Sequence, residues 1–174
     1  MTLQPEQATL LLQQALGTLM REHETTRKVI EAIPVDKGDY RPDPFAKTAD
    51  ELAWHIANAE NMFLEGILSG EFVFSRVRPE SVRNSADIAA WYVERFGENY
   101  NRLKQLSTDQ LVKAVDFRGL FQLPEIMYVQ TALHHSVHHR GQLSVYLRPM
   151  GGKVPAIYGE SYDSAQARKA AVAS

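Results

Sequence analysis

Histidine is concentrated in one short stretch of this sequence, and its spacing there suits a metal ion. The window HHSVHH holds four of the six histidines in the chain. His134 with His138 and His135 with His139 have the i, i+4 spacing that stacks side chains on one face of a helix. When the surrounding helix is drawn at about 100° per residue, His135 and His139 lie roughly 100° and 60° from its apolar centre, and the other pair about 160° away. The sequence therefore predicts that His135 and His139 face inward.

A third imidazole would complete a set of ligands, and His55 and His23 are the candidates. His55 lies in the amphipathic run ELAWHIANAENMFLEGIL, on the flank of its buried stripe. His23 lies directly on the apolar stripe of an earlier run, so we expect its side chain in the core. His55 is therefore the better candidate.

The types of ligand indicate which ions fit. Three neutral imidazoles suit zinc, nickel or iron(II), whereas magnesium and calcium take oxygen ligands. Three protein ligands leave coordination positions open for water or substrate, as in catalytic rather than structural sites. The chain has no ExxH or HExxH motif, which argues against a di-iron carboxylate centre and a zincin-type protease. It also has no cysteine, so any thiol in the chemistry must come from outside.

Length and composition limit the class of protein. The 174 residues, 44% of them hydrophobic, fit one domain that spans residues 1–174, because no Pro-rich or Gly-rich linker divides them. Lys and Arg number 19 against 21 Asp and Glu, with no basic stripe, so we expect no nucleic-acid partner. There is no apolar stretch of membrane-spanning length and no signal-peptide pattern. We therefore expect a cytoplasmic protein with no membrane partner.

Four amphipathic runs must position the histidines, and each has recognisable boundary residues. A proline opens the first run, a capping box opens the second and an Asn-Ser pair the third, while Pro-Met-Gly-Gly closes the fourth. A short helical turn is expected between the third and fourth runs. No strand signal stands out, and the tail 151–174 reads as mostly irregular. The pattern predicts an all-α four-helix bundle without a sheet, with helices over 5–33, 48–70, 84–107 and 123–149.

Over roughly residues 5–160 the sequence resembles the DinB/YfiT-like superfamily of metal-binding four-helix proteins. The resemblance rests on ELAWHIANAE, on DYRPDP and on HHSVHHRGQLSVYLRPMGGKVPAIYG. It implies up-down-down-up connectivity and a divalent metal bound by three histidines, at the positions of His55, His135 and His139. It also implies a homodimer, which Trp54 supports because it points away from the apolar stripe of its own helix.

The resemblance implies a reaction less directly, because members of the superfamily differ in their chemistry. The favoured hypothesis is a metal-dependent enzyme of the thiol S-transferase type. It would act on small electrophiles and use an external low-molecular-weight thiol. The alternatives are a non-catalytic metal-binding protein related to stress, a metal-dependent hydrolase, and a helical interaction module whose histidines only pack.

Several residues near the histidine window invite more specific predictions. Arg140 lies near the apolar stripe, where an unpaired guanidinium would be costly. Glu60 is its expected partner, and the alternative is that Arg140 reaches solvent. Gln142 either hydrogen-bonds beside a ligand or is a surface residue. Tyr158 and Tyr162 either fold over the open metal positions or cover the core.

Overall fold

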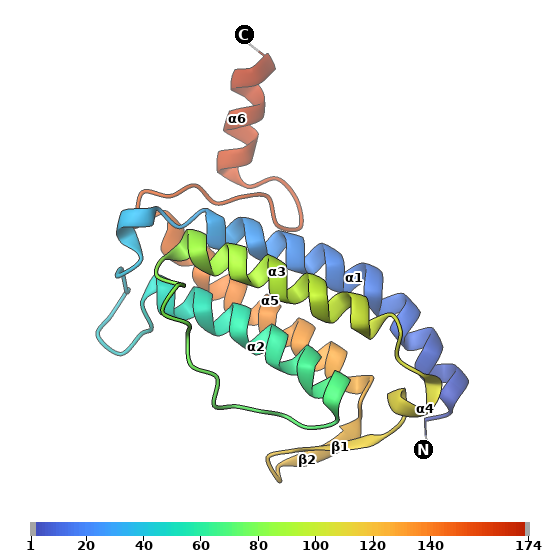
Figure 1. Ribbon diagram of the computed structural model, residues 1–174. Helices are drawn as coiled ribbons and strands as arrows, with labels where there is room; N and C mark the ends of the chain where they lie inside the picture. Colours follow the sequence, from blue (N-terminus) through green and yellow to red (C-terminus); the bar gives the residue numbers. More distant parts are fainter. Residues whose placement is uncertain (1–2, 173–174) are drawn as a thin grey trace.

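Four long helices form the centre of the molecule, which is described over residues 3–172 in a computed structural model (Figure 1). α1 and α5 run in one direction along the bundle, and α2 and α3 run in the other. α1 and α2 each pack against both α3 and α5. The predicted all-α four-helix bundle is confirmed, and the directions match up-down-down-up connectivity. The bounds are α1 Pro5–Glu31, α2 Ala49–Ser69, α3 Ser85–Leu103 and α5 Met127–Leu147.

Local sequence sets where the helices begin and end. Thr48 Oγ1 accepts a hydrogen bond from the Glu51 N–H, and the Glu51 carboxylate accepts one from the Thr48 N–H, which forms the predicted capping box of α2. Asn84 Oδ1 caps α3 by accepting from the Asp87 N–H. Gly70 caps the end of α2, and its φ of 77° is a left-handed conformation that favours glycine.

The expectation that the chain has no sheet is wrong. After the predicted helical turn, α4 (Thr108–Leu111), the strands β1 (Ala114–Phe117) and β2 (Phe121–Pro124) form an antiparallel hairpin. At its tip Arg118 and Gly119 have φ angles of 59° and 69°, and Asp116 accepts from the Gly119 N–H. Apolar residues alternate on both sides of this Arg-Gly step, which is typical of strands. The prediction of helices alone did not take this pattern into account.

The tail is also more regular than expected, because Tyr162–Val172 forms the helix α6. Ser161 Oγ accepts a hydrogen bond from the Ser164 N–H, which is the pattern of an N-cap. None of the residues of α6 is buried, and the helix projects from the bundle in Figure 1. A local cap rather than tertiary packing therefore starts α6. Residues 173 and 174 of the predicted tail lie outside the described residues.

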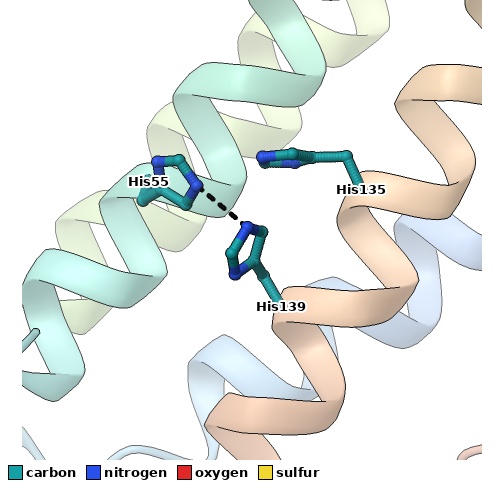
Figure 2. A group of neighbouring side chains, drawn as sticks. All are labelled: His55, His135 and His139. Carbon is teal, nitrogen blue, oxygen red and sulfur yellow. Dashed lines mark hydrogen bonds between the residues drawn. The ribbon is translucent and has the colours of Figure 1, made fainter. Parts of the chain in front are cut away.

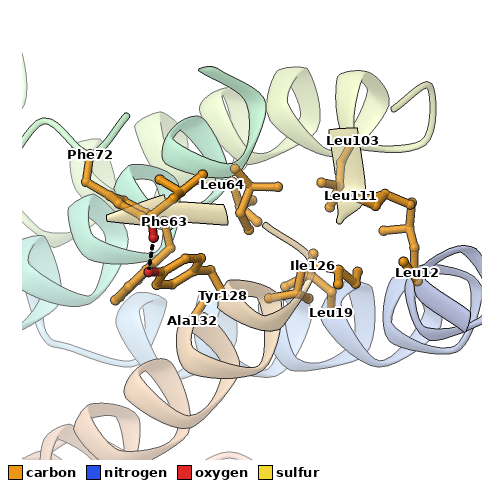
Figure 3. Close-up of a cluster of buried hydrophobic side chains, with 14 of the residues drawn as sticks. Leu12, Leu19, Phe63, Leu64, Phe72, Leu103, Leu111, Ile126, Tyr128 and Ala132 are labelled. Carbon is orange, nitrogen blue, oxygen red and sulfur yellow. Dashed lines mark hydrogen bonds between the residues drawn. The ribbon is translucent and has the colours of Figure 1, made fainter. Parts of the chain in front are cut away.

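The core consists of two apolar clusters, one toward each end of the bundle. Figure 3 shows the cluster beside the hairpin, where the Tyr128 hydroxyl donates to the Val115 carbonyl oxygen over 2.7 Å. No helix within residues 3–172 is both long enough and apolar enough to cross a membrane.

A buried polar layer separates the two clusters, and the carboxylate of Glu60 is its centre. Glu60, from α2, is fully buried. It accepts hydrogen bonds from His23 Nδ1 (3.3 Å), the Tyr92 hydroxyl (2.7 Å) and the Ser136 hydroxyl (2.7 Å). These donors come from α1, α3 and α5, so one carboxylate ties all four helices together. The predicted burial of His23 is confirmed.

Arg140 is 1% exposed, so it does not reach solvent. The prediction that Glu60 is its partner is wrong, because Arg140 pairs with Glu22. Its Nη1 lies 2.7 Å from a carboxylate oxygen of Glu22 on α1, and its Nη2 donates to the Tyr158 hydroxyl over 2.7 Å. Tyr158 in turn donates to Glu22 over 2.9 Å. Glu60 already has three donors, and Arg140 is directed toward α1 rather than α2. Tyr158 therefore fastens the segment after α5 to α1.

This contact predicts unequal roles for Arg140 and for Arg148, the residue that follows α5. Arg148 also meets an acid and a tail tyrosine, since it lies 3.3 Å from Asp163 and 5.8 Å from the Tyr162 ring, but it is exposed. Arg140→Met should lower the free energy of unfolding by about 3 kcal/mol, because it leaves the mostly buried Glu22 carboxylate unpaired. Arg148→Met should change it by no more than about 0.5 kcal/mol. Urea denaturation measures both, and equal losses would contradict the proposed difference.

Candidate metal centre

Three histidines from two antiparallel helices converge at one place on the bundle. Figure 2 shows His55 on α2 facing His135 and His139 on α5. One donor nitrogen from each lies within 4.8 Å of the others, and the Nε2 atoms of His55 and His139 are 3.2 Å apart. Ligand nitrogens around a tetrahedral ion are about 3.4 Å apart. The structure therefore brings the three predicted ligands together, and His55 and His139 have nearly the spacing that an ion needs.

The polar layer explains why this pair of histidines, and not the other, faces α2. Ser136 and Arg140, each one residue beyond a candidate ligand, are buried and anchored to Glu60 and Glu22. That anchoring fixes the rotation of α5 about its axis. His134 and His138 consequently lie on the exposed side, so the orientation predicted from helical phase is confirmed.

Gln142 orients one of the imidazoles. His139 Nδ1 donates to Gln142 Oε1 over 2.8 Å. A neutral imidazole carries one N–H, so His139 Nε2 keeps its lone pair, and that atom faces His55. The Gln142 amide nitrogen in turn donates to His138 Nε2 over 3.2 Å. Both predictions for Gln142 are therefore confirmed, because it is a surface residue and it also hydrogen-bonds to a candidate ligand.

The surroundings keep two of the imidazoles neutral. Burial, followed by the charge of His139 and then that of Lys47, lowers the pKa of His55 to about 4. Burial and then the charges of His139, His55 and His138 lower the pKa of His135 to about 4. Neutral imidazole is the form that binds metal. In addition, His135 Nδ1 is buried without a hydrogen-bond partner within residues 3–172. These features fit a divalent ion.

The other residues considered for the site lie elsewhere. His23 is bound to Glu60 and is not a fourth ligand. Tyr158 and Tyr162 contact Arg140 and Arg148 instead of the histidines. In the described part of the chain, no carboxylate joins the three-histidine group. An open pocket of about 420 Å³ lies beside His139. There is therefore space for an external molecule next to His139.

A family model described as DinB family matches residues 7–170, nearly the whole chain, so the protein belongs to the DinB family. Two proteins of Bacillus subtilis (strain 168) are similar in sequence. The uncharacterized protein YjoA is 28% identical over 141 residues, which are 79% of this chain and 90% of YjoA. The uncharacterized protein YrdA is 28% identical over 143 residues, which are 79% of this chain and 82% of YrdA.

Two solved structures have a similar fold. The crystal structure of the DinB-like protein YjoA from Bacillus subtilis superposes with a TM-score of 0.70 at 26% identity, over 84% of this chain and 99% of that one. A DinB-like protein from Bacillus cereus ATCC 10987 also gives 0.70 at 26% identity, over 83% of this chain and 95% of its own. The resemblance read from the sequence is thus confirmed.

The lowered pKa values predict how stability depends on pH in the metal-free protein. In an unfolded chain histidine titrates near pH 6.5, whereas His55 and His135 titrate near 4 in the fold. As pH falls, the unfolded state binds protons first, so stability is fully present above about pH 6.5 and is lost between about 6.5 and 4. His135→Gln should make this slope shallower. Urea unfolding of chelator-treated protein measures it, and a slope unchanged by the substitution would contradict the assignment.

Proposed function

We propose that this DinB-family protein binds a divalent metal ion through His55, His135 and His139. Zinc and nickel are the first candidates, and iron(II) is a further one. The observation that carries the proposal is the convergence of three imidazoles from two helices within 4.8 Å, with lowered pKa values at two of them. Gln142 supports it further, because it leaves the Nε2 lone pair of His139 free to coordinate.

We propose further that the protein is an S-transferase that joins a small external thiol to a small electrophile. A metal ion bound here would lower the pKa of the thiol and hold it as a thiolate. The sulfur then forms a bond to an electrophilic carbon, the leaving group departs with the electron pair, and the thiol proton passes to solvent. The chain itself has no cysteine, and the pocket beside His139 offers space for both reactants.

Two observations favour transfer over hydrolysis and over a purely structural ion. No carboxylate joins the histidine group within residues 3–172, and the nearby buried acid Glu60 already accepts three hydrogen bonds. A hydrolase that relies on a carboxylate general base would therefore have no candidate for it among these residues. A closed, non-catalytic site would need a fourth ligand or a covering tail, and His23 and Tyr158 are engaged elsewhere.

A homodimer stays a prediction, with less support than the sequence suggested. Trp54 lies 4.7 Å from the ring of Trp91 on α3, and Arg76 lies over that ring at 5.6 Å. The indole of Trp54 is therefore partly covered within its own chain. The family resemblance is the remaining argument for a second copy.

Metal content tests the assignment of the ligands. His135→Ala and His139→Ala each remove one of three ligands, so the metal bound per chain should fall to background. His134→Ala and His138→Ala change exposed neighbours on the same helix and should retain it. Elemental analysis of protein purified without a His-tag decides between the pairs. Loss in the His134 variant with retention in the His135 variant would overturn the proposed orientation of α5.

Turnover tests the proposed reaction. Metal-loaded protein is supplied with each of several low-molecular-weight thiols and with an aryl halide or an epoxide, and formation of the thioether is followed. The rate should exceed background in the wild type and in His134→Ala, and should be lost in His135→Ala and after chelation. A rate that survives in metal-free His135→Ala would exclude metal-dependent S-transfer.

A further inference from the structure

The pocket beside the histidine centre has a polar inner wall and an apolar side. His139 and Gln142 line it, so the pocket and the centre share a wall. Leu52, Val145 and Tyr146 form much of its remaining surface. Its volume of about 420 Å³ is within the range of sites for small molecules. The wall residues therefore determine which molecules can approach the three histidines from this side.

Lys47 is the only cationic side chain among the residues that line this pocket in the described part of the chain. Its side chain is exposed and takes part in no ion pair within residues 3–172. It lies close enough to the centre for its charge to act on His55. A cation is thus available at the mouth of the pocket.

Asp43, Asp50 and Glu51 are the acids nearest in sequence to Lys47, and none of them forms an ion pair with it within residues 3–172, although its charge helps to lower the pKa of Glu51. Asp43 Oδ1 accepts from the N–H groups of Phe45 and Ala46, which forms the turn before Lys47. Glu51 accepts from the Thr48 N–H in the capping box of α2. Both carboxylates have structural roles in the loop and helix start that present Lys47. The lysine therefore remains able to pair with an external anion.

The apolar side of the pocket indicates what the anion is attached to. Leu52 is 2% exposed and forms the floor, whereas Val145 is 72% exposed at the rim. Tyr146 is held in place by an edge contact with Tyr40, with ring centroids 5.8 Å apart. An aliphatic chain of a few carbons would remove much of this surface from water, at about 0.8 kcal/mol per buried CH₂. A small inorganic anion would leave that surface uncovered.

We propose that this pocket binds a small organic carboxylate, with the carboxylate at the Lys47 ammonium and the apolar chain against Leu52, Val145 and Tyr146. The inference deepens the proposed function and rests on it in one respect: the far end of such a ligand meets the three-histidine centre. The proposed substrate or co-substrate is therefore a molecule that carries a carboxylate a few carbons from its reacting group.

Binding of matched chemical probes tests the proposal. Hexanoate, its neutral isostere hexanamide, and acetate are titrated into the zinc-loaded and the chelator-treated full chain, and amide chemical shifts of pocket residues report binding. Hexanoate should bind about fivefold more tightly than hexanamide, as expected of an ion pair near solvent. It should also bind at least about tenfold more tightly than acetate, because acetate lacks the apolar chain.

Variants assign the preference to Lys47. Lys47→Gln should remove the advantage of hexanoate over hexanamide, while Lys47→Arg should keep it. Lys28→Gln, an exposed lysine of α1 outside the pocket, is the matched control and should behave as the wild type. If hexanoate does not shift the pocket residues, or keeps its advantage in Lys47→Gln, the proposal is overturned.

The same samples separate this inference from the proposed function. Zinc content is measured on each of them. A chain that binds no zinc but shows the Lys47-dependent preference would support the pocket and refute the metal centre. A chain that binds zinc and prefers hexanoate only when loaded, regardless of Lys47, would show that the carboxylate binds the ion instead, which refutes the pocket as proposed.

Discussion

The hydrogen bonds to one buried carboxylate constrain the rest of this structure. Glu60 has no contact with solvent, and a buried charge is costly unless donors surround it. His23, Tyr92 and Ser136 supply those donors from the three other helices. Sliding or rotating any helix would leave the carboxylate short of a partner. The apolar clusters on both sides tolerate small shifts more easily, because their contacts have no direction.

The histidine centre inherits its geometry from this layer. Ser136 is held by Glu60, so the residues on either side of it along α5 have fixed directions, and His135 is turned toward α2. Four residues later Arg140 is held by Glu22 in the same way, next to His139. The polar interior and the candidate site are thus on two sides of the same segment of α5. One side binds Glu60 and Glu22, and the other faces His55.

The features that the sequence predicted correctly are those that depend on the helical period and on helix capping. The inward pair His135 and His139, the burial of His23 and the start of α2 at Thr48 all follow from local spacing. The partner of Arg140 was missed because it depends on which helix lies opposite in the assembled bundle. The hairpin was missed because the alternation of apolar residues extends over only four residues in each strand, which is too short to stand out between the long helical patterns. Lys47 lies in an aperiodic linker, so only the folded chain places it beside His139.

The two sides of the histidine group are separated by 84 positions along the chain. An ion held there would join α2 to α5 across that distance in the folded state only, since an unfolded chain rarely brings three such residues together. Folding and ion binding are then linked, so free ion at a hundred times its dissociation constant would add about 2.7 kcal/mol to the folded state. Resistance to heat would in that case report on metal supply, and the amount of folded protein in a cell would follow the availability of the ion.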